Sequence, residues 1–196
     1  KMAVQAAEAF AKAGYPLDAE AILIIELDGA DAELATLNDQ VTELLRSHGA
    51  YQIDEAHDAS QQARLWKGRK SAFPAVGRLS PDYLCMDGTI PRKTLPTVLS
   101  EIDVISQTFG LAVANVFHAA DGNLHPLILF DANVPGQTDK AMAMGRLIVN
   151  MGGVHGMRGM SLKRLQTTSQ DPMLTGTCAD HRLRHLPAHK RRALRL

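Results

Sequence analysis

Residues Val113 to Phe130 read VANVFHAADGNLHPLILF. Two apolar runs flank a short polar segment with Asp121-Gly122 at its centre. An Asp-Gly pair between apolar runs is a strong hairpin signal, because a type I′ turn needs positive φ at both central residues. We therefore predict an antiparallel hairpin that turns at Asp121-Gly122, in which His118 directly faces His125.

The two facing histidines suggest a metal site. Directly opposed residues point to the same side of a sheet, with Cβ atoms about 5 Å apart. Two imidazoles so placed can bind one metal ion at roughly 2.1 Å per nitrogen. The alternative is a pair of half-buried histidines, His118 and His125, that hydrogen-bond and do nothing more.

Four segments resemble one known family, and they occur in the family's order. They are Tyr15-Pro-Leu-Asp-Ala-Glu-Ala-Ile-Leu, Trp66-Lys-Gly-Arg-Lys-Ser-Ala-Phe-Pro-Ala-Val-Gly-Arg, Pro81-Asp-Tyr-Leu-Cys-Met-Asp-Gly-Thr-Ile-Pro-Arg and His118-Ala-Ala-Asp-Gly-Asn-Leu-His-Pro. Together they resemble the flavin-linked 2-hydroxyacid dehydrogenases of the vanillyl-alcohol oxidase superfamily. The likeness covers roughly residues 1–150. One departure is Ala120, where the family usually has glycine, which would carry a steric cost if that position needs positive φ.

The resemblance implies an α+β fold, the ferredoxin-like antiparallel sheet with helices on one face that forms the C-terminal domain of FAD-linked oxidases. It implies FAD, bound mainly by a flavin domain upstream of Lys1, and a divalent metal such as zinc or manganese. His118 and His125 match the family's metal ligands. Arg69 matches its substrate-binding arginine, and a guanidinium suits a carboxylate in a two-pronged way. Without the resemblance, Arg69 is equally well a residue on a solvated helix face.

Hydrophobic periodicity predicts the remaining elements. We expect helices over 2–13, from Asp31 as the N-cap to Gly49, over 56–72, over 95–109 and over 138–150. We expect strands over 20–27, 50–53 and 83–90. These elements predict one domain over residues 1–150, built on a single antiparallel sheet with helices on one face. Pro126 cannot donate to a ladder, so we expect it at a sheet edge or facing away from the neighbouring strand.

The character of the chain changes beyond Met151. The family's Gly-Glu-His-Gly motif, which supplies a glutamate ligand and a histidine base, is represented only by Gly152-Gly-Val-His-Gly, so His155 is a candidate for that base. Residues 151–196 form a divergent basic tail that we expect to be poorly ordered. A reading-frame change or a truncated gene explains this tail more simply than a nucleic-acid-binding or membrane-binding arm.

Charge and composition exclude several classes of protein. The formal charge is zero, but residues 1–150 hold 12 Lys or Arg against 19 Asp or Glu, and residues 151–196 hold 9 against 2. An acidic body argues against nucleic acid as a partner. No run is long enough to cross a bilayer, and the two cysteines form no framework. A cytosolic setting follows, with peripheral association at the inner membrane left open.

Three functions are open on the sequence. The first is the substrate and metal domain of an FAD-dependent 2-hydroxyacid dehydrogenase that oxidises glycolate or D-lactate, a fragment that is inactive when isolated. Its partners would be a small 2-hydroxy acid, the flavin domain and other oxidase subunits. The second is a non-catalytic interaction module that binds a partner subunit or flavin domain. The third is a metal-dependent hydrolase using His118, His125 and Asp121, which lacks a third ligand together with a base.

Overall fold

The computed structural model describes residues 1–166 and 191–195 of the chain. These residues divide into two compact units where we expected one domain over 1–150. The first unit contains residues 3–71 and the strand at 191–195, and the second contains residues 72–166. Each unit has its own sheet, so the prediction of a single sheet is wrong. The physical reason is that residues 191–195, which we expected to belong to the tail, pair with the strands at 24–28 and 54–56. The three strands form a separate sheet.

The first unit is a three-stranded antiparallel sheet with helices. Along the chain its elements are α1 (Met2–Ala11), β1 (Ile24–Asp28), α2 (Asp31–Ser47), β2 (Asp54–Ala56), α3 (Ala59–Lys70) and β7 (Arg191–Arg195). The strand order is β1-β7-β2. Ala30, not Asp31, is the N-cap of α2, and its N–H donates to the Glu33 carboxylate at 3.2 Å. Asp58 caps α3 by accepting from the Gln61 N–H at 2.8 Å.

The second unit contains the hairpin. Its elements are α4 (Ala72–Val76), β3 (Asp82–Thr89), η1 (Arg92–Thr94), α5 (Leu95–Phe109), β4 (Val113–His118), β5 (Asn123–Phe130), α6 (Gln137–Val154) and β6 (Arg158–Gln166). The four strands pair antiparallel in the order β4-β5-β3-β6. This β-α-β-β-α-β chain order is the ferredoxin-like arrangement. The predicted α+β fold is confirmed.

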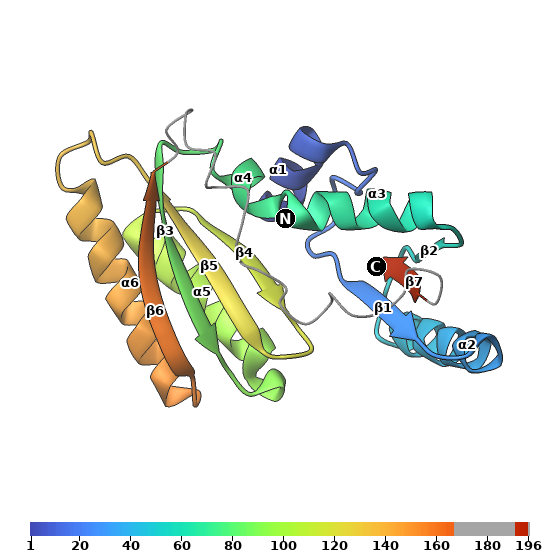
Figure 1. Ribbon diagram of the computed structural model, residues 1–196. Coiled ribbons are helices and arrows are strands. Elements are labelled where there is room, and N and C mark those ends of the chain that lie inside the picture. The colour runs from blue at the N-terminus through green and yellow to red at the C-terminus, as the bar shows by residue number, and fades with distance from the viewer. Residues whose placement is uncertain (167–190, 196) are drawn as a thin grey trace. The chain divides into compact units, whose positions relative to one another are not determined.

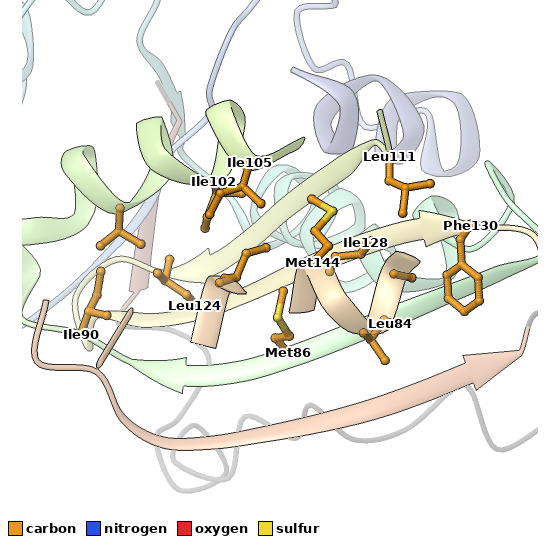
Figure 2. Close-up of a cluster of buried hydrophobic side chains, with 13 residues drawn as sticks. Leu84, Met86, Ile90, Ile102, Ile105, Leu111, Leu124, Ile128, Phe130 and Met144 are labelled. Atoms are coloured by element: carbon orange, nitrogen blue, oxygen red, sulfur yellow. The ribbon is translucent and has the colours of Figure 1, made fainter. Parts of the chain in front are cut away.

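The core of the second unit lies between its sheet and the two helices α5 and α6, which cover one face of the sheet (Figure 1). Figure 2 shows Leu84 and Met86 of β3, and Leu124 and Ile128 of β5, among side chains from those helices. All four are at most 1% exposed. Side chains alternate along a strand, so the even-numbered residues of β3 and β5 point to the helices and the odd-numbered ones point to the opposite face.

Strand β6 lies in the part of the chain that we expected to be a poorly ordered tail. It pairs with β3 from Asp82↔Gln166 to Thr89↔Arg158 and supplies the fourth strand of the sheet. Its backbone pairs with the edge of β3 that β5 leaves open. Local hydrophobicity does not indicate this pairing. Residues 167–190 and 196, the rest of the predicted basic tail apart from β7, lie outside the described residues.

Pro126 lies in an interior strand, because β5 is flanked by β4 on one side and β3 on the other. Of the two alternatives expected for Pro126, the edge position is therefore wrong. The β3–β5 register runs to Cys85↔Leu127 and resumes at Gly88↔Leu124, so the ladder is interrupted opposite His125 and Pro126. A residue without an N–H is tolerated here because the sheet forms no ladder pair at that point.

Candidate functional site

The hairpin has a longer loop than predicted. His118 pairs with Asn123 rather than with His125, and Val116 is the residue opposite His125. The loop is Ala119–Gly122, closed by the Asp121 N–H to the His118 carbonyl at 3.2 Å and by the Gly122 N–H to the Ala119 carbonyl at 3.3 Å. Positive φ occurs at Gly122 but not at Asp121, so the type I′ turn is not formed. Ala120 also has no positive φ, and the alanine there carries no left-handed strain.

The two histidines nevertheless lie on the same face of the sheet, as predicted. Their ring centroids are 5.8 Å apart with the planes at 84°. His125 is 1% exposed, and the Phe73 ring of α4 packs edge-on against it at 5.7 Å. His118, at the end of β4, is half-buried. This is the face opposite to α5 and α6, so the two imidazoles are separated by the sheet from the main core of the unit.

A carboxylate joins this face from the neighbouring strand. Continuing the β3–β5 register from Gly88↔Leu124 places Asp87 across from His125. Asp87 Oδ1 lies 3.5 Å from His125 Nδ1, and the aspartate is 46% exposed while the histidine is buried. The sequence reading missed Asp87, although it is the one charged residue within the apolar stretch Tyr83–Ile90. That interruption of an apolar strand was the available signal.

The candidate base His155 lies elsewhere in the second unit. It caps the C-terminus of α6, and its Nε2 contacts both carboxylate oxygens of Glu101 on α5, at 3.0 and 3.1 Å. Both residues belong to the helical layer, whereas His118 and His125 lie on the other face of the sheet. The structure therefore does not bring His155 together with the two-histidine pair.

Arg69 lies in the first unit, in the last turn of α3, and is half-buried. Lys67 and Lys70 share that turn. Cations at a helix C-terminus are stabilised by the helix dipole, which gives Arg69 a structural role besides the predicted one. Tyr83 is 2% exposed and is a core residue.

The donors present meet part of what a divalent metal needs. His118 and His125 offer two nitrogen ligands on one face, and imidazole suits zinc and other first-row divalent metals. No group of three or more His, Cys, Asp or Glu side chains that could hold a metal occurs in the described part of the chain. A catalytic zinc site normally has three protein ligands. The two histidines thus fit a metal as a partial ligand set.

Comparison with known proteins identifies the family. Residues 1–157 match the family described as FAD linked oxidases, C-terminal domain. The chain is 50% identical over 169 residues to the glycolate oxidase subunit GlcD of Escherichia coli strain K12, covering 84% of this chain and 34% of that protein. It is 27% identical over 167 residues to the Bacillus subtilis subunit of the same name, covering 80% of this chain and 36% of that protein.

A further relative is a probable mitochondrial D-lactate dehydrogenase of Danio rerio, 30% identical over 115 residues, which are 57% of this chain and 23% of that protein. The chain belongs to the FAD-linked oxidase family, of which residues 1–157 form the C-terminal domain. It spans about a third of the length of the glycolate oxidase subunits that it matches. Among the residues that the structure describes, no helix is long and apolar enough to cross a membrane.

Proposed function

We propose that this chain is the substrate-domain portion of an FAD-dependent 2-hydroxyacid dehydrogenase, which oxidises glycolate or D-lactate by hydride transfer to the flavin. The observation that carries this proposal is the pair of imidazoles, His118 and His125, 5.8 Å apart on one sheet face within the region that matches the family. The flavin is bound mainly by a part of the protein outside this chain, since the chain spans about a third of its glycolate oxidase relatives.

Three requirements of the reaction divide between the residues of this chain and the rest of the enzyme. The substrate carboxylate must be held, the hydroxyl proton must be removed, and the carbon-bound hydrogen must be aimed at the flavin. The family resemblance assigns the substrate carboxylate to Arg69, a role that suits a guanidinium because it can make two parallel hydrogen bonds to a carboxylate. His118 and His125 hold a divalent metal, which when bound supplies a Lewis acid that lowers the pKa of the substrate hydroxyl.

The chain's own residues orient the two imidazoles. Asp87 contacts Nδ1 of His125, and in a neutral imidazole whose Nδ1 carries the proton, Nε2 is left as the donor to a metal. Phe73 packs against the His125 ring and limits its rotation. Burial of His125 also keeps bulk water from competing for its nitrogen. The general base is not assigned within the described residues, because His155 is paired with Glu101 in the helical layer.

The experiment is a Mn²⁺ titration of the purified chain, followed by electron paramagnetic resonance. His118→Ala and His125→Ala are expected to weaken Mn²⁺ binding by about tenfold or more, and His155→Ala, the matched control, to leave it unchanged. Binding should also weaken in acid, because only neutral histidine ligates. Metal affinity that is the same in all four proteins would overturn the site assignment.

The substrate class is tested on the Mn²⁺-loaded chain. Glycolate should perturb the Mn²⁺ signal more than acetate does, because acetate lacks the hydroxyl. The isolated chain should be colourless and should not reduce a dye with glycolate or D-lactate, since loss of a positioned base alone costs about 10²–10⁴-fold. Turnover by the isolated chain, or equal effects of glycolate and acetate, would contradict the proposal.

A further inference from the structure

The residue that pairs with His118 carries an unusual atom. Asn123 is the first residue of β5, where it faces His118 on β4 and Thr89 on β3. Its side-chain oxygen Oδ1 is buried and has no hydrogen-bond partner among the residues that the structure describes. Buried polar atoms in proteins are nearly always satisfied, so an orphaned acceptor calls for an explanation.

The orphaned oxygen belongs to the face of the two-histidine pair. Figure 2 shows that Leu124 points into the helix-side core, so Asn123 and His125, its neighbours on either side, point to the opposite face. His118 is directly opposed to Asn123, which places their Cβ atoms about 5 Å apart. Three donor side chains, two imidazoles and one amide, thus come from adjacent positions on one face.

We infer that the Asn123 amide oxygen is a further donor to the divalent metal held by His118 and His125. Carbonyl oxygens are metal ligands, and an amide oxygen beside two imidazoles suits Mn²⁺ better than a pair of imidazoles alone. The inference rests on the proposed metal site and adds to it a neutral oxygen donor. It explains why an acceptor is kept buried and without a protein partner at this position.

A second residue provides a matched control. Asn115 on β4 also has a buried side-chain oxygen that finds no hydrogen-bond partner within the described part of the chain. Val113 and Phe117, two positions away on either side, pack against the helix-side core, so Asn115 lies on the face opposite to the histidines. The two asparagines share the same chemistry and differ in the face of the sheet to which they belong.

The experiment measures Mn²⁺ affinity, and separately the urea midpoint of the metal-free chain, for four variants. Asn123→Leu should lower Mn²⁺ affinity by about tenfold or more and raise the urea midpoint, because it removes a buried unsatisfied acceptor without changing the side-chain size greatly. Asn123→Asp should raise Mn²⁺ affinity, since it presents a charged oxygen in the same place. Asn115→Leu and Asn115→Asp should leave the affinity unchanged.

The outcomes separate this inference from the proposed function. Loss of Mn²⁺ binding in His118→Ala and His125→Ala, with no change in either Asn123 variant, would overturn the role of Asn123 and leave the histidine site standing. Unchanged binding in the histidine variants would overturn both. Weaker binding in Asn123→Asp would show that the amide group donates a hydrogen bond at this site, and that result also overturns the inference.

Discussion

Gly122 in the hairpin loop is a position where an added methyl group should strongly lower the free energy of unfolding. Its φ is +67°, a left-handed conformation that costs an L-residue about 1–2 kcal/mol. A Cβ at this position would also lie closer than 3.0 Å to the Ile90 carbonyl oxygen, and 3.2 Å from the Ile90 carbonyl carbon. Both atoms are backbone, so neither can rotate away. The contact is fixed by the Ile90 N–H, which donates to the Gly122 carbonyl at 2.9 Å.

The expected loss for Gly122→Ala is therefore the sum of two parts. The left-handed conformation contributes about 1 kcal/mol after the gain from a stiffer unfolded chain is subtracted. Moving the Ile90 backbone and weakening its hydrogen bond contributes about 2 kcal/mol more. Gly110 is the matched control, because its φ is +58° and, among the described residues, a Cβ there would meet only the Lys140 Nζ, at 3.9 Å. Gly110→Ala should lose about 1 kcal/mol, from the conformation alone.

The assay is urea unfolding of both variants and the wild type, followed by circular dichroism, with Mn²⁺ affinity measured on the same samples. Gly122→Ala should lose about 2 kcal/mol more free energy of unfolding than Gly110→Ala. It should also bind Mn²⁺ more weakly, because its loop joins the strands that carry His118 and His125. Equal losses in the two variants would refute the steric part of the reasoning and leave only the conformational part.

Two further predictions concern other parts of the chain. Gly68→Ala in α3 should destabilise the protein by about 1–3 kcal/mol, because its Cβ would overlap the Tyr15 ring. Gly153→Ala in α6 should stabilise the protein by up to about 1 kcal/mol, because its Cβ would meet nothing within 4 Å among the described residues. Urea unfolding that shows a change of the same sign in both variants would contradict this prediction. Burial raises the pKa of Tyr83, so its contribution to stability is present below about pH 10 and is lost as pH rises through the folded-state pKa. Between pH 8 and about pH 11, the Tyr83→Phe variant should therefore lose less free energy of unfolding than the wild type. The same pH dependence of the free energy of unfolding in both proteins would contradict this prediction.

The two histidines show which feature of a hairpin can be predicted from its sequence. Asp121-Gly122 indicated the turn, but the structure places two more residues in the loop, so His118 pairs with Asn123. The side-chain period of a strand is two, so an error of two residues in the register keeps every side chain on its predicted face. The same-face placement of His118 and His125 was therefore predictable even though their direct pairing was wrong.

Other features depended on contacts far apart in the sequence. The helices were readable because their apolar residues recur on one face, and Gly110 ends α5 with φ +58° as its position predicted. The division into two sheets could not be predicted from local sequence, because β7 pairs with strands more than a hundred residues earlier and β6 pairs with β3. Asn is typical of turns, where it hydrogen-bonds the local backbone, so nothing local marks Asn123 as a strand residue. Its place as the first residue of β5 follows from the longer loop, which local sequence did not reveal.

The sheet of the second unit explains how the chain tolerates the buried side-chain oxygen of Asn123. An orphaned buried acceptor costs about 1–3 kcal/mol. The helix face of the same strands buries Leu84, Met86 and Ile128, each of which stabilises the fold by about 1.5–3 kcal/mol. The helix face of β3 and β5 thus offsets the cost of the polar side chains that the opposite face carries. A residue on the histidine face should for this reason be replaceable by an apolar one without unfolding the chain, whereas Ile128→Ala should cost about 2–5 kcal/mol.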